Sequence, residues 1–330
     1  MQEKGGFSGK TATVFGGTGF LGRHIVRKLA RLGVRIRVVT RVPERAYFLK
    51  PFGDVGQIVP VRCDYTDLLS VAAVIRGSDF VINCVGILYE KRKKSVFQRA
   101  HVDLPAMIAR ICAEEGVKRF VHVSALGCSA GISRYARSKL AGEQVVLSNY
   151  PKVTLLRPRV MFGCDDNFFN MFASLSRYMP FLPLIGGGKT KLQPVYVADV
   201  ADAAIEAVCL TSDQYTGRTY QLGGPEVMDF RDIYALVFSC TGRKKRLVYL
   251  PFKLAKYCAW FMEWMPRPLL TRDQVNSLRT DSVVQEGALG FSSFGIIPKS
   301  VRIVSPQYLE RYKQGGGSIP GHEFVPAPQN

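Results

Sequence analysis

The chain has 330 residues, of which 47% are hydrophobic, and its 45 lysines and arginines against 26 acidic residues give a formal net charge of +19. This length and composition predict a folded protein with a large core, and no apolar run reaches the roughly 18 residues that span a bilayer. The charge indicates an acidic partner, an anionic membrane surface or a solvated basic surface. Nucleic acid is disfavoured as a partner because no recognition motif accompanies the charge.

The cysteines and histidines show neither a Cys-x-x-Cys pair nor the spacing of metal ligands. We therefore expect reduced, buried thiols and no metal site. The first residues, MQEKGGFSGK, have no apolar core for secretion and are too short for a transit peptide. The cysteines are Cys63, Cys84, Cys112, Cys128, Cys164, Cys209, Cys240 and Cys258.

The stretch from Thr11 to Arg41 predicts a nucleotide-binding unit. A short apolar strand (residues 12–15) enters the glycine-rich loop GGTGFLG, helical spacing follows from Phe20, and residues 34–40 form a second strand. Glycine suits the sharp turn, the approach to a diphosphate and the close packing of the helix, whose first N–H groups face the phosphates. The context of strand, glycine turn, helix and strand raises this motif above coincidence.

The end of the second strand selects the nucleotide. An NAD site places Asp or Glu there for the ribose 2′-hydroxyl, whereas this chain has Arg41, with Arg45 one helical turn further on. A guanidinium suits a 2′-phosphate, so we expect NADP(H). The alternative is a solvated arginine in a basic protein.

Strands and helices then alternate. Residues 57–63, 80–84 and 119–124 are predicted strands, and 68–75 and 102–115 are predicted helices. This order predicts an α/β fold with a doubly wound parallel sheet. Asp64 follows the third strand, where it faces an adenine or caps the next helix.

A candidate catalytic group follows the fifth strand. Ser124 ends that strand, and Tyr135 and Lys139 share one face of the next helix. A nearby ammonium lowers the pKa of a phenol, which would let Tyr135 exchange a proton while hydride moves at a nicotinamide. Two other Tyr-x-x-x-Lys pairs, Tyr89/Lys93 and Tyr249/Lys253, lack this context.

The second half predicts a sixth strand at 153–157, broken by Pro158, an aromatic helix at 168–178 and a glycine turn at 186–188. In the strand-to-helix segment 192–208, Asp199 is most simply an N-cap, and residues 219–223 form a last strand. Residues 252–265 form an amphipathic helix that either lies on a membrane or partner, or is an ordinary buried helix.

These motifs resemble the short-chain dehydrogenase/reductase superfamily, in its extended and atypical branches: GGTGFLG, CDYTD, Asn83-Cys84-Val85-Gly86, SRYARSKLAGE and LLRPRVMFG. The resemblance implies a Rossmann-type domain and a Ser–Tyr–Lys triad of Ser124, Tyr135 and Lys139. It also implies cofactor contacts from Gly16, Thr18, Gly19, Phe20, Leu21, Gly22, Arg41, Arg45, Asp64, Val85, Gly86, Ser124, Tyr135, Lys139 and Pro158.

Together with these motifs, the stretch LPFKLAKYCAWFMEWMPRPLLTRDQVNSLRTDSVV (250–284) resembles the family of NADPH-binding accessory subunits of respiratory complex I. That resemblance implies a non-catalytic subunit at the junction of the peripheral and membrane arms, near the quinone site. It would lie peripherally on the cytoplasmic face of a bacterial inner membrane or the matrix face of a mitochondrial one, and the starting Met without a presequence favours the bacterial case. The alternatives are an active NADP-dependent oxidoreductase or epimerase, and a nucleotide-sensing regulator.

The expected organisation has two domains. A dinucleotide-binding domain comprises residues 1–160, to which the chain returns at about 190–225. A smaller, mostly helical C-terminal domain comprises 161–189 and 226–312. The Gly/Pro-rich residues 313–330 are expected to form a flexible tail.

Overall fold

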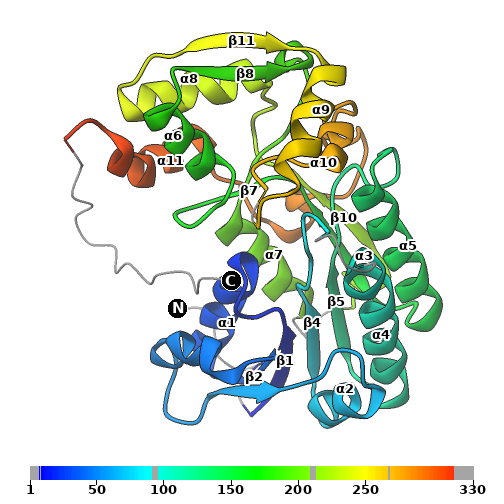
Figure 1. The fold of residues 1–330 in the computed structure, drawn as a ribbon. Coiled ribbons are helices and arrows are strands. Elements are labelled where there is room, and N and C mark those ends of the chain that lie inside the picture. Colours follow the sequence, from blue (N-terminus) through cyan, green and yellow to red (C-terminus); the bar gives the residue numbers. More distant parts are fainter. Residues whose placement is uncertain (1–6, 8, 91–95, 209–212, 267, 316–330) are drawn as a thin grey trace.

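The computed structural model describes residue 7 and residues 9–90, 96–208, 213–266 and 268–315. Cys209 and nearly all of the predicted tail therefore lie outside the described residues. Within these ranges a parallel sheet organises the larger part of the molecule (Figure 1), with the strand order β10-β6-β5-β4-β1-β2-β3. Its strands are β1 (Thr11–Phe15), β2 (Arg35–Thr40), β3 (Ile58–Arg62), β4 (Phe80–Asn83), β5 (Arg119–Val123), β6 (Thr154–Pro158) and β10 (Thr219–Leu222).

Helices cover both faces of this sheet because its strands are apolar on both sides. One face buries Val14 and Val38 against α1 (Phe20–Arg31) and α7 (Val197–Val208). The opposite face buries Phe15 and Val39 against α2 (Leu68–Ile75), α4 (Leu104–Glu114) and α5 (Arg134–Asn149). Short helical segments lie at Pro43–Phe52 and α3 (Val96–Gln98). The predicted doubly wound parallel sheet is confirmed.

The strand order fixes where a ligand fits. The chain runs from β1 outward to β2 and β3, and then crosses back so that β4 pairs with the other side of β1. In open α/β sheets the crevice at such a reversal, beyond the carboxyl ends of the strands, is the usual ligand site. The glycine loop after β1 opens into this crevice.

The remaining elements pack around a separate aromatic cluster that includes Phe172, Phe230 and Tyr234. This part of the molecule contains two short parallel pairs, β8 with β11 and β7 with β9 (Figure 1). The division into two domains, with the boundaries given above, stays a prediction. The elements are β7 (Met161–Phe162), β8 (Phe181–Ile185), β9 (Val195–Tyr196), β11 (Arg246–Leu250), α6 (Phe169–Tyr178), α8 (Phe230–Thr241), α9 (Phe252–Met262), α10 (Arg272–Ser277) and α11 (Val301–Leu309).

Some local predictions were wrong. The helix expected at 102–115 begins earlier, at Val96, and passes through a π-helical turn at Arg99–Asp103 before α4. Pro158 does not break the strand: it ends β6, paired with Leu222, because its carbonyl can still accept from the N–H of Leu126 (2.9 Å). Among the described helices, none has the length and apolar character that a membrane span requires.

Two aspartates differ from their expected capping roles. Asp67, not Asp64, caps α2, and its carboxylate accepts from the backbone N–H groups of Leu69 and Ser70. Asp199 lies inside the first turn of α7, and its carboxylate accepts from the N–H of Lys299 at 2.7 Å. The second contact joins α7 to the C-terminal segment, a long-range role that sequence spacing does not reveal.

Candidate functional site: the carboxyl edge of the sheet

The glycine loop has the geometry that a diphosphate requires. Gly16 turns the chain with φ +73°, in the left-handed region that favours glycine. A Cβ on Gly22 would lie 2.1 Å from the carbonyl oxygen of Gly16, so only glycine lets α1 start this close to the loop. A Cβ on Gly19 would meet only that same oxygen, at 3.1 Å, within 4 Å. The loop therefore packs tightly against the rest of the protein at Gly22 and leaves space for a ligand at Gly19.

The N-terminus of α1 is suited to an anion. Gly19 is its N-cap and supplies no side-chain cap, and the first turn carries no acidic residue. Lys28 and Arg31 lie in the last turn, where cations stabilise the helix. The first-turn N–H groups and the positive end of the helix dipole thus remain available to a phosphate. Thr18, Phe20 and Leu21 border this end, and Leu21 is buried beneath it.

Arg41 and Arg45 lie beside the neighbouring strand. Arg41 directly follows β2, Arg45 lies in the short helix after it, and both side chains are solvent-exposed. Asp64 follows β3, is exposed as well, and accepts from both the N–H and the hydroxyl of Thr66 (2.9 and 2.7 Å). These bonds lower the pKa of Asp64. At this edge of the sheet, Arg41 and Arg45 face solvent, whereas the carboxylate of Asp64 is hydrogen-bonded to Thr66 in the adjacent turn.

The segment after β4 approaches the catalytic candidates. Asn83 accepts from the N–H of Val85 (3.0 Å) through Oδ1, so its amide nitrogen donates to Nδ1 of His122 (3.2 Å). A Cβ on Gly86 would lie 3.3 Å from Nζ of Lys139. The segment 85–86 is therefore fixed by Asn83 and lies against Lys139, and its predicted contact with the cofactor stays a prediction.

The direction of the pKa shift expected at Tyr135 was wrong, while its role in proton transfer stays a prediction. Burial raises the pKa of Tyr135 to about 12, and the nearby charge that opposes this rise is Arg159. Lys139 is a buried residue of α5, donates to the carbonyl oxygen of Val123 (3.2 Å), and has its pKa lowered to about 8 by burial. Desolvation outweighs the effect of a nearby ammonium on the phenol. Near neutral pH the site therefore holds a neutral phenol and a mostly charged lysine.

Of the alternative pairs, Tyr249 lies in β11, outside the main sheet, and Lys93 lies outside the described residues. Ser124 follows β5 beside Tyr135 and is 4% exposed. Its hydroxyl has no well-formed hydrogen bond within the described chain, although the Cys128 thiol lies next to it. The structure thus brings Ser124, Tyr135 and Lys139 to one place.

His101, which sequence reasoning missed, supports this place from the π-helical turn. Its Nε2 accepts from the N–H of Ile87 (3.1 Å), so its Nδ1 carries the proton and donates to the hydroxyl of Ser138 (2.8 Å). Its ring contacts Tyr135 edge-to-face, with 5.5 Å between centroids. Burial lowers the pKa of His101 to about 3, so the imidazole stays neutral. The π-helical turn itself, which occurs often at functional sites, gives no clear sequence signal.

The C-terminal part contributes a direct contact to the same helix. Asp273, in α10, accepts from the backbone N–H groups of Arg134 and Tyr135 (2.7 and 3.0 Å), the first residues of α5. Thr271 and Gln274 form a capping box that starts α10 and orients it. The sequence stretch LTRDQV contains the residues of this capping box, but it does not reveal that Asp273 contacts α5. Asp273 thus ties the second domain to the helix that carries Tyr135.

Two arginines at the end of β6 were also missed as functional candidates. Arg157 forms a bidentate ion pair with Glu143 of α5 (2.8 and 2.5 Å). Arg159 lies beside Tyr135 with its Nε buried, and it forms neither a hydrogen bond nor an ion pair with the described residues. The signal available in the sequence was an arginine directly after Pro158, where the chain leaves a buried strand.

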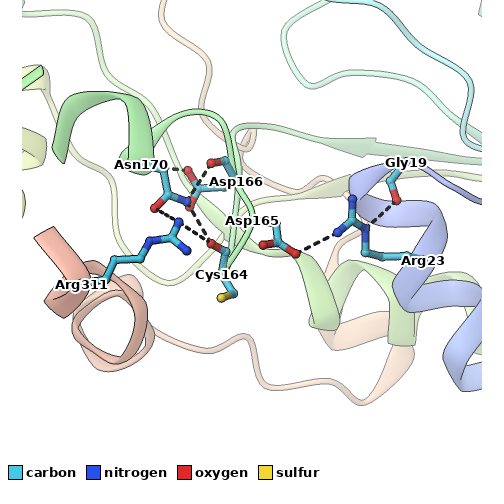
Figure 2. A network of polar contacts seen from close by, with 7 residues as sticks. All are labelled: Gly19, Arg23, Cys164, Asp165, Asp166, Asn170 and Arg311. Carbon is cyan, nitrogen blue, oxygen red and sulfur yellow. Dashed lines mark hydrogen bonds and ion pairs between the residues drawn. The ribbon is translucent and has the colours of Figure 1, made fainter. Parts of the chain in front are cut away.

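A polar network joins the glycine loop to the C-terminal helix (Figure 2). Arg23 donates to the carbonyl oxygen of Gly19 (3.4 Å) and pairs with Asp165 (2.8 Å) in the loop after β7. In the same loop, the carbonyl oxygen of Cys164 accepts from Arg311, two residues after α11 (3.1 Å), and Arg311 also donates to Asn170 (2.7 Å). The C-terminal part of the chain is therefore held to the nucleotide-binding part by contacts here and at Asp273.

Comparisons with known proteins agree with this geometry. Residues 12–223 match the model of the NAD dependent epimerase/dehydratase family. The chain is 39% identical to "NADH dehydrogenase [ubiquinone] 1 alpha subcomplex subunit 9, mitochondrial" of Arabidopsis thaliana, over 94% of this chain and 79% of the relative. The protein of that name in Rattus norvegicus is 33% identical, over 93% of this chain and 81% of the relative.

Among solved structures, the NADPH-dependent quinone oxidoreductase QOR2 of Escherichia coli, complexed with NADPH, is similar with a TM-score of 0.72. The two share 18% sequence identity, and the match covers 90% of this chain and 99% of that one. At this identity the likeness concerns the fold, which is that of a Rossmann-type nucleotide-binding protein.

Proposed function

Because this chain belongs to the NAD dependent epimerase/dehydratase family and, within it, to the family of the complex I alpha subcomplex subunit 9 proteins, we propose that it is an accessory subunit of respiratory complex I that binds a nicotinamide nucleotide. One observation carries this: the likeness to those subunits extends over 94% of the chain, well past the family match at 12–223. The likeness therefore extends over the segments of α9 and α10.

The nucleotide in this proposal is NADP(H). It would place its diphosphate on Gly16, Gly19 and the start of α1, and its nicotinamide towards Ser124, Tyr135 and Lys139. Arg41 follows β2 and is exposed, so its guanidinium is free to hold a 2′-phosphate. The other cofactor contacts predicted from the sequence would lie at the same edge of the sheet. Turnover is expected to be little or none, and Tyr135, with a pKa raised to about 12, holds too little phenolate near neutral pH to act as a base.

The partner face in this proposal is α9. Ala255 and Ala259 are fully buried on its inner side, while Trp260 and Phe261 on the outer side are 42% and 75% exposed. The alternative of an ordinary buried helix is therefore wrong. Exposed aromatic residues next to Lys253 suit an interface with complex I subunits near the quinone site, or the rim of an anionic membrane. The protein would then lie peripherally on the inner membrane, on its matrix or cytoplasmic face.

A native pull-down from membranes, followed by mass spectrometry and release of the bound nucleotide, tests this function. The expected result is co-purification of complex I subunits with one slowly exchanging NADP(H) per chain. A monodisperse protein without complex I subunits that oxidises NADPH with a metabolite would contradict the proposal and favour an enzyme. Arg62, the exposed last residue of the neighbouring strand β3, offers a control for Arg41: Arg41→Ala should release the nucleotide and Arg62→Ala should retain it.

A further inference from the structure

The charges at the end of β6 leave one cation without a counter-ion. Glu143 satisfies Arg157 through two hydrogen bonds and has 3% of its side chain exposed. No carboxylate of the described chain is positioned to do the same for Arg159, whose titratable neighbour is the neutral phenol of Tyr135. Burial without a partner lowers the pKa of Arg159. The Nε of Arg159 is buried without a hydrogen-bond partner, and an unpartnered buried donor is costly, so its presence calls for an explanation.

The side chains around Arg159 carry hydroxyl groups that can donate hydrogen bonds. Tyr135 is a neutral phenol, and Ser124 has a buried hydroxyl without a well-formed hydrogen bond. The ion pair between Glu143 and Arg157 holds α5, which carries Tyr135, over the end of β6. The N–H of Ser124 donates to the carbonyl oxygen of Leu156 in β6 (2.8 Å), so Ser124 lies at the same end of the sheet. The backbone bond from Leu126 N–H to the carbonyl oxygen of Pro158 holds the ends of β5 and β6 together beside it. The guanidinium of Arg159 and the hydroxyls of Ser124 and Tyr135 can thus all donate to one ligand, and none of the three carries a negative charge.

We propose that Arg159, with the hydroxyls of Ser124 and Tyr135, binds an oxyanion, the carboxylate or phosphate group of a small molecule, beside the Tyr135–Lys139 face. A guanidinium fork is the side chain best matched to such a group, and its bonds to an anion are stronger than those to a neutral acceptor. The site goes beyond the proposed function and does not depend on assembly with complex I. Binding would also relieve the unpaired buried charge.

The test uses the full chain saturated with NADPH, titrated by calorimetry with benzoate, phenyl phosphate and the neutral benzamide. We expect at least one of the two anions to bind about tenfold or more tightly than benzamide, and Arg159→Met to remove that preference. The benzoate and phenyl phosphate arms separate a carboxylate from a phosphate ligand. Arg137→Met, on the exposed side of α5, is the matched control and should keep the preference.

Equal binding of benzamide and both anions, or an unchanged preference in Arg159→Met, overturns the proposal. So does a tenfold loss of NADPH affinity in Arg159→Met together with no anion binding to the loaded protein, since Arg159 would then hold a phosphate of the nucleotide itself. A second readout is ligand-free stability. Arg159→Met should unfold at the same or a higher temperature than the unsubstituted protein, whereas a drop as large as that of Arg157→Met would mark Arg159 as a structural residue and contradict the site. These outcomes leave co-purification with complex I unaffected.

Discussion

Arg157 and Arg159 lie two residues apart at the end of one strand, yet their surroundings are opposite. Arg157 meets a buried carboxylate with two hydrogen bonds, and Arg159 meets a neutral phenol. Burial lowers the pKa of Arg159, whereas the bonds from Glu143 raise that of Arg157. A paired buried charge fixes structure, and an unpaired one reduces stability unless a ligand completes it. The same edge of the sheet thus combines a structural ion pair with an incomplete binding site.

The largest effect is expected from breaking the paired side. Glu143→Gln leaves Arg157 buried without its counter-ion, and we expect a loss of about 3–5 kcal/mol in the free energy of unfolding, measured by urea denaturation. Glu114→Gln removes an exposed pair with Arg110 and is expected to cost less than about 1 kcal/mol. Equal losses of unfolding free energy in the two variants would show that the buried pair adds no more stability than the exposed pair.

Lys139 adds a third buried cation to the comparison. Its pKa is lowered to about 8 in the folded protein, so the unfolded chain binds more protons between pH 8 and 10.5. Stability should therefore rise with pH in this window, by roughly 3 kcal/mol at most, because the destabilising charge is lost first from the folded state. Other groups titrate there as well, so the measurement is the difference between the unsubstituted protein and Lys139→Met. A flat difference from pH 8 to 10.5 would rule out the lowered pKa.

Loss of the contact between Asp273 and α5 should have a smaller effect on the free energy of unfolding. Asp273→Ala removes the acceptor of two N–H groups at the start of α5 and should cost about 1–2 kcal/mol in urea unfolding. It should also increase proteolysis near Tyr135. Glu310→Ala, which removes an exposed pair with Lys313, is the control and should change neither. Unchanged protection of α5 in Asp273→Ala would mean that the domains are held by other contacts.

The smallest effect on stability is expected at α9. Phe261→Ser removes an exposed ring and should change the unfolding free energy by less than about 0.5 kcal/mol, while reducing the fraction that co-sediments with membranes. Leu69, exposed on α2, is the matched control, and Leu69→Ser should leave that fraction unchanged. Equal membrane partitioning of both variants would remove α9 from the interface.

The sequence predicted features that depend on local patterns. The glycine loop, the doubly wound sheet and the pairing of Tyr135 with Lys139 on one helix follow from spacing within short segments. The contact of Asp273 with α5 could not be predicted, because it joins residues far apart in the chain. The pKa of Tyr135 was predicted in the wrong direction, because its burial depends on how β5, β6 and α5 pack together. The unpaired state of Arg159 depends on the same packing.

The most direct test of the central claim is a comparison of the dissociation constants of NADPH and NADH for the full chain and for Arg41→Ala. The account predicts that the unsubstituted protein binds NADPH at least about tenfold more tightly than NADH, and that Arg41→Ala weakens NADPH binding while leaving NADH binding unchanged. Equal affinity for the two nucleotides in the unsubstituted protein, or loss of both in Arg41→Ala, would contradict it.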